Sequence, residues 1–156
     1  MNFKEIVEEI ITHYNISGVD LSKVNVGVKI DLQNGGELIF QEDEVLNVCT
    51  MATTLFSLPA DNDLPGLYET LLLGQAYGVG TNDTYFTVDL EQRKVVLFKN
   101  LPLNIANPEY IHSSIDRFVE CMIAWQQAHQ KGQLQSAIQA QSNSAQPPQF
   151  DLGQLV

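Results

Sequence analysis

One stretch of strictly alternating residues constrains the fold more than any other feature of the chain. Between residues 24 and 32, apolar side chains occupy every second position, the pattern of a strand with one buried face. Asn34-Gly35-Gly36 follows directly, and this composition favours a tight hairpin turn. The next strand must therefore run antiparallel beside the first. The alternating apolar residues are Val24, Val26, Val28, Ile30 and Leu32.

The same signals recur and predict an antiparallel sheet of about five strands. An acidic turn at 42–44 continues the meander, and the polar turn at 91–93 joins two later strands. Consecutive hairpins leave no need for the crossover helices of a parallel sheet. The predicted strands are 24–32, 37–41, 45–51, 85–90 and 94–101.

Three segments have the apolar spacing of amphipathic helices, at about 2–14, 64–73 and 108–131. Pro65 and Pro108 suit the first turns of the second and third of these helices. The predicted order is α-β-β-β-α-β-β-α. The fold class is therefore α+β, with the antiparallel sheet covered by three helices.

A chain of 156 residues has room for one domain, which we place at 1–131. Residues 132–156 are rich in Gln and Ser and contain too few apolar residues for a core, so we expect a flexible tail there. Neither a secretory leader nor an apolar run long enough to cross a bilayer is evident. Cys49 and Cys121 stand far apart without a CxxC motif, which favours buried thiols in a reducing cytoplasm.

The charge of the chain excludes two classes of partner. Nineteen acidic residues against eight basic ones give a formal net charge of -11. Such a field repels the phosphates of nucleic acids and the headgroups of anionic membranes. We therefore expect neither nucleic acid nor membrane binding.

No motif for catalysis or metal binding is evident in the sequence. His13, His112 and His129 lack the spacing of known metal motifs, so we expect no metal and no cofactor. The glycines of Gly78-Val79-Gly80 follow a predicted helix, whereas a phosphate loop follows a strand. No serine or cysteine has the context of a nucleophile. These observations predict a protein that is not an enzyme.

The predicted helices and strands carry more apolar surface than one small domain needs, and a sheet of this kind also leaves open edges. Both features indicate a protein partner, and an extended peptide can add a strand to a sheet edge.

In the order of its elements, the chain resembles the class I type III secretion chaperones, the Tir-chaperone family. The likeness covers about residues 1–131 and depends on the order of several short segments, none diagnostic alone. These are Phe3 to Tyr14, Leu67-Tyr68-Glu69-Thr70-Leu71-Leu72, Leu101-Pro102-Leu103, and Phe118-Val119-Glu120 with Trp125.

The resemblance implies a homodimer in the bacterial cytoplasm that binds an extended N-terminal segment of a secreted effector and keeps it soluble and competent for export. It also admits contact with the export-apparatus ATPase. It implies no chemical step. The resemblance places the dimer interface on the second helix, at Leu67, Tyr68, Leu71 and Leu72. Our candidates for effector binding are Phe3, Val7, Ile10, Phe40, Phe86 and Val88. The alternative for most of these six is that they form the core of the chain.

Two other readings stay open from the sequence. A small α+β enzyme or ligand-binding domain would enclose a pocket lined by inward polar groups, for which the strands offer mainly Asn47, Thr50 and Thr87. An adaptor that regulates a cytosolic partner without export would look the same as a chaperone.

Overall fold

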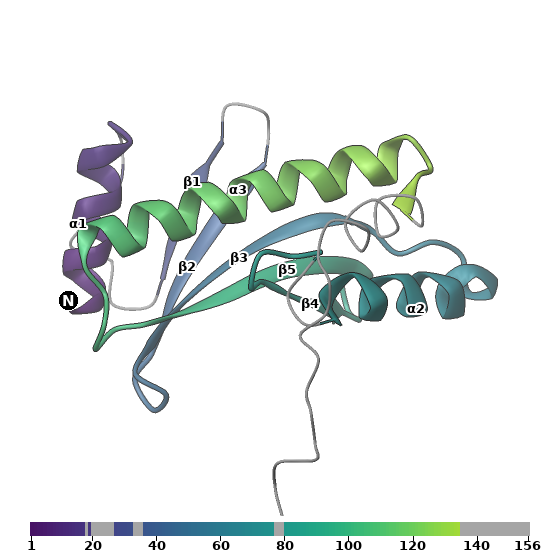
Figure 1. Ribbon diagram of the computed structural model, residues 1–156, viewed down its shortest axis with the longest axis horizontal. Coiled ribbons are helices and arrows are strands. Elements are labelled where there is room, and N and C mark those ends of the chain that lie inside the picture. The colour runs from purple at the N-terminus through teal and green to yellow at the C-terminus, as the bar shows by residue number, and fades with distance from the viewer. Residues whose placement is uncertain (18, 20–26, 33–35, 77–79, 135–156) are drawn as a thin grey trace, which may run out of the picture.

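A five-stranded antiparallel sheet with strand order β1-β2-β3-β5-β4 forms the base of the fold (Figure 1). The computed structural model describes residues 1–17, 19, 27–32, 36–76 and 80–134. The long central strands β3 and β5 pair with each other, and β1 and β4 are the two edges. The strands are β1 (Val28–Asp31), β2 (Glu37–Asp43), β3 (Val48–Ser57), β4 (Tyr85–Asp89) and β5 (Lys94–Pro102).

Three helices complete the fold: α1 (Phe3–His13), α2 (Leu64–Gln75) and α3 (Pro108–Gln130). The 3-10 turn η2 (Asp61–Asp63) leads into α2. Asn2 and Glu5 form a reciprocal capping box at the start of α1, and the Asn107 side chain accepts from the Tyr110 amide at the start of α3. After α3 the chain turns at Gly132, whose φ of 65° is unfavourable for other residues.

The core lies between α3 and one face of the sheet (Figure 1). Buried residues alternate along β3 and β5, so each strand presents one face to α3 and the other outward. Phe118 and Met122 of α3 are fully buried against this face, as are Met51 and Leu97 of the sheet. α1 packs against α3 near the β1 edge, while α2 packs against β4 at the opposite edge.

The predicted fold class and the order α-β-β-β-α-β-β-α are confirmed. The boundaries around the β2–β3 turn were wrong: the strand expected at 37–41 continues to Asp43, and the strand expected at 45–51 begins at Val48 and continues to Ser57. The Asp43 side chain accepts from the Leu46 amide, and Asn47 has a left-handed φ of 54°. These two features hold residues 44–47 in a turn, and Val45 is exposed there.

Several predictions fall on parts of the chain outside the described residues. They are the start of the first strand at 24–26, the turn glycine at 35, and 135–156 of the expected tail. The domain boundary after residue 131 therefore stays a prediction. In the described part of the chain, no helix combines the length and the apolarity that crossing a membrane requires.

Both cysteines are free and buried, as predicted. Burial raises the pKa of the Cys49 thiol to about 12, and the nearby Glu42 charge adds to the effect. Burial also raises the pKa of the Cys121 thiol, and a hydrogen bond between this thiol and Thr84 lowers that pKa to a smaller extent. Both thiols are therefore held in the neutral, unreactive form at neutral pH.

A close contact between a glycine and a tryptophan joins α2 to α3. A Cβ atom placed on Gly74 would lie 2.5 Å from Cη2 of Trp125, so only glycine fits there. The Trp125 ring is buried, donates from Nε1 to the Gly80 carbonyl at 2.9 Å, and meets Phe86 of β4 edge to face. The ring cannot move aside without breaking these contacts.

We predict that Gly74→Ala lowers the free energy of unfolding by about 1–2 kcal/mol, because overpacking outweighs the gain in helix propensity. Gly66 of the same helix is the matched control, since nothing lies within 4 Å of the position of its Cβ. Gly66→Ala should leave stability unchanged or raise it by up to about 1 kcal/mol. Urea denaturation measures both. Equal effects of the two substitutions would contradict the packing argument.

Candidate functional site

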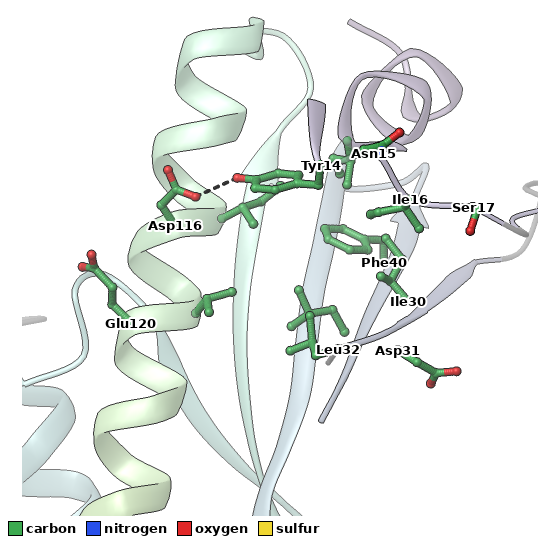
Figure 2. Close-up of a pocket in the computed structure, with 14 residues that line it drawn as sticks. Tyr14, Asn15, Ile16, Ser17, Ile30, Asp31, Leu32, Phe40, Asp116 and Glu120 are labelled. Atoms are coloured by element: carbon green, nitrogen blue, oxygen red, sulfur yellow. Dashed lines mark hydrogen bonds between the residues drawn. The ribbon is translucent and has the colours of Figure 1, made fainter. Parts of the chain in front are cut away.

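A groove of about 700 Å³ lies between α1, the β1–β2 edge of the sheet and α3 (Figure 2). Its apolar lining comes from all three walls. Ile10 belongs to α1, Ile16 to the turn after it, Ile30 to β1, Phe40 to β2 and Val119 to α3. Leu32, Leu38 and Ile115 complete this lining. The groove therefore joins segments that lie more than 100 residues apart in the sequence.

Among the lining residues that the structure describes, every charged side chain is acidic. Asp116 and Glu120 lie on α3, and Asp31, the last residue of β1, lies on the opposite side (Figure 2). Lys29 on β1 neutralises part of this charge through ion pairs with Asp31, at 3.7 Å, and with Glu37. The groove thus combines an apolar floor with an acidic rim.

A hydrogen bond closes one end of the groove. Tyr14 at the end of α1 donates from Oη to Oδ1 of Asp116 on α3 at 2.7 Å (Figure 2). Burial, together with the hydrogen bond and the charge of Asp116, raises the pKa of the Tyr14 hydroxyl. The hydroxyl stays protonated and continues to donate at neutral pH, which fixes the spacing of the two helices there.

The outer edge of β1 borders this groove and ends the sheet. In the strand order, β1 has a single neighbour, β2, among the described strands. Edge strands present unpaired N–H and C=O groups that an extended chain can pair with. An apolar groove beside an open strand edge offers an extended peptide both side-chain pockets and backbone partners.

A second apolar groove, of about 330 Å³, lies between α2 and β4. Tyr68, Leu71 and Leu72 of α2 line one side, and Phe86 and Val88 of β4 line the other. Leu72 is 63 % exposed in the single chain and the neighbouring Leu73 is 57 % exposed. Exposed leucines beside an edge strand are typical of a surface that another chain covers.

The structure divides the six predicted effector residues into two groups. Phe3, Val7, Ile10 and Phe40 are buried in the core, as the alternative for them stated, although Ile10 and Phe40 also line the first groove. Phe86 and Val88 are half-buried and lie at the opposite end of the sheet, in the second groove. The six residues therefore do not form one surface.

The four predicted dimer residues lie on α2, but only part of each helical turn faces outward. Leu67 and Leu71 point into the core, while Tyr68 is half-buried and Leu72 is exposed. The second groove joins three of these four residues with Phe86 and Val88. Their assignment to a dimer stays a prediction.

The polar groups expected around an enclosed pocket do not converge. Asn47 is exposed in the β2–β3 turn, and Thr87 is exposed on β4. Thr50 donates to Oδ1 of Asn100 at 2.9 Å on the sheet. The structure therefore offers these three side chains no common cavity.

Sequence reasoning did not identify several residues that line the first groove. Ile16, Leu32 and Val119 are only partly buried there, and Tyr14 and Asp116 clamp its end. Val119 is one of the apolar positions from which the last helix was predicted, but its spacing along the helix is the same as that of core residues. No sequence signal separates a groove residue from a core residue when both lie on one apolar face.

Comparison with solved structures gives the same fold at low identity. One chain of the HopA1–SchA chaperone–effector complex matches with a TM-score of 0.63 and 11 % identity, over 81 % of this chain and 94 % of that chain. One chain of the ExsC–ExsE complex matches with a TM-score of 0.66 and 11 % identity, over 81 % of this chain and 96 % of that chain. One chain of the heterodimeric ExoU–SpcU complex from the type III secretion system of Pseudomonas aeruginosa matches with a TM-score of 0.52 and 12 % identity. The match covers 85 % of this chain and 95 % of that chain.

No family model and no curated protein matches the sequence. The likeness lies in the fold, and there it spans nearly the whole length of the matched chains. The fold is that of the class I type III secretion chaperones, so the resemblance stated from the sequence is confirmed at this level.

Proposed function

We propose that the protein is a type III secretion chaperone of the bacterial cytoplasm that holds an extended segment of a secreted effector. The observation that carries the proposal is the match of the whole α+β fold to chains from chaperone–effector complexes. The groove at the β1 edge supports it, because it offers apolar contacts and open backbone groups to an extended chain. Holding such a segment needs binding and no chemical step, so the proposed activity is not enzymatic.

The chemistry of the groove defines the segment that it fits. Apolar side chains of the segment would occupy the floor around Phe40 and Val119, and a strand paired with β1 would direct every second side chain there. Lysine or arginine at the intervening positions would point to the other face of the sheet and meet Asp31, the exposed last residue of β1. Asp116 and Glu120 on α3 would attract a basic residue at the end of the row that faces the floor. The proposed ligand is an extended segment with alternating apolar and basic residues near the N-terminus of the effector.

We further propose that two copies associate through α2 and β4. The second groove and the exposed Leu72 and Leu73 lie at the sheet edge opposite the first groove, which leaves the effector groove of each copy accessible. Contact with the export-apparatus ATPase would follow effector binding.

Purification of the untagged protein under native conditions from its own cells tests the function. The proposal expects a secreted protein to co-purify, with a protease-protected segment near its N-terminus. A small-molecule ligand, or a cytosolic partner that is never exported, would contradict the chaperone role and favour the domain with a pocket or the adaptor.

Binding should depend on the groove and not on apolar surface in general. Val119 and Ile123 are both half-buried on α3, but only Val119 lines the groove. We predict that Val119→Asn weakens effector binding about tenfold, since it removes an apolar contact at the centre of the interface. Ile123→Asn should change binding less than about twofold. Calorimetric titration with the effector segment measures the affinity of both variants. Equal losses of affinity would show that the effector does not bind in the groove.

Dimerisation should depend on the exposed face of α2. Leu72→Glu places a carboxylate in the proposed apolar interface, so we predict a monomer of 17.4 kDa by light scattering, with unfolding of the chain little changed. Leu71→Glu would not separate loss of the dimer from loss of folding, because Leu71 is buried in the core of the chain.

Val45 provides the matched control for Leu72. It is 94 % exposed in the β2–β3 turn, away from α2, so Val45→Glu should leave the dimer intact. A Leu72→Glu protein that stays dimeric would show that the interface lies elsewhere.

A further inference from the structure

Glu9 and His13 of α1 and His112 of α3 meet where the two helices pack together. Each offers one ligand atom, and the three atoms lie within 4.8 Å of one another. Glu9 and His13 stand one helical turn apart, so both project from the same side of α1. Two imidazoles and one carboxylate are the donor set of many zinc sites that keep a fourth position for water. The sequence spacing gave no sign of the cluster, because its members come from opposite ends of the chain.

The His112 side chain gives an independent observation in favour of a ligand at this cluster. Its Nε2 atom is buried and makes no hydrogen bond. It lies 3.0 Å from Oε1 of Glu9, so the two atoms are close, but their arrangement does not meet hydrogen-bond geometry. A buried nitrogen without a hydrogen bond is uncommon and unfavourable. A cation between the imidazole and the carboxylate would satisfy both groups.

The position of His13 allows the cluster to close around an ion. Zinc binds nitrogen and oxygen ligands at about 2.0–2.2 Å, so two ligand atoms of a tetrahedral site lie about 3.3–3.6 Å apart. The present spread of 4.8 Å must therefore shrink by more than about 1 Å. His13 is exposed in the last turn of α1, and its ring stacks on His112 with centroids 3.5 Å apart. A rotation of the exposed His13 side chain would bring its nitrogen toward the other two ligand atoms and would break the stacking on His112.

We propose that Glu9, His13 and His112 form a binding site for a divalent transition-metal ion of the zinc class. Imidazole ligands favour zinc, copper and nickel, whereas calcium and magnesium require oxygen ligands. The bound ion would link α1 to α3. Ile10 and Tyr14 of α1 line the first groove, so the ion would rigidify the wall of this groove that α1 forms. The proposal stands on this cluster alone and does not depend on the chaperone function.

Calorimetric titration of the untagged full-length protein with zinc chloride at about pH 7.5, where the ligands can lose their protons, tests the site. We expect one ion per chain with a Kd below about 100 μM, and no response to magnesium or calcium. Cobalt should produce the visible absorption bands of a tetrahedral nitrogen and oxygen site. Binding weaker than this limit, or an equal response to magnesium, would overturn the proposal.

Histidine variants locate the ion. His13→Gln should weaken zinc binding about tenfold or more and should still fold, because His13 is exposed. His129 is the matched control: it is also an exposed histidine, but it stacks on Phe56 near the other end of α3. His129→Gln should change binding less than about twofold. If His13→Gln binds zinc like the unmodified protein, or if His129→Gln loses binding equally, the assignment is wrong.

Discussion

The packing of α3 against one face of the sheet is the contact on which the rest of the structure depends. Its buried residues cover β3 and β5, α1 packs against it, and α2 approaches it at the contact of Gly74 with Trp125. Near its N-terminus, Asp116 accepts the hydrogen bond from Tyr14 of α1. Near its C-terminus, Trp125 fills the space that Gly74 of α2 leaves. α3 lines the first groove directly and contacts α2, which lines the second, and the two grooves lie at opposite edges of the same sheet.

The fold could be predicted from the sequence because each element follows its own periodicity. The amphipathic spacing from Phe3 onward and the alternation around Ile30 specify which side of an element faces inward. The β2–β3 turn was misplaced, since it is held by a hydrogen bond from the Leu46 amide to the Asp43 side chain and by the left-handed Asn47. Such turn chemistry leaves only a weak mark in the sequence.

The candidate site could be predicted only in part. Periodicity shows that Phe40 and Leu71 face inward, but it does not show whether the inward side meets the core or a partner. In the structure both residues are buried, and the half-exposed Val119 and the exposed Leu72 are the more informative positions. The cluster of Glu9, His13 and His112 was not predicted from the sequence. Its formation depends on how α1 packs against α3, which no local pattern reveals.

The acidic charge of the chain has a local meaning in the groove. A net charge of -11 favours solubility in a protein with exposed leucines, and the carboxylates of Asp31, Asp116 and Glu120 concentrate part of this charge beside an apolar floor. Screening by salt acts on the charges and leaves the apolar contacts in place. A basic segment would therefore be attracted by the rim and retained by the floor.

Hydrogen exchange of the protein with and without its co-purified partner tests the central claim most directly. The account predicts that the partner slows exchange of backbone amides in β1, at the edge of the sheet, and in the neighbouring turns of α1 and α3 that line the groove. Protection confined to the outer face of β3 and β5, with β1 unchanged, would contradict it.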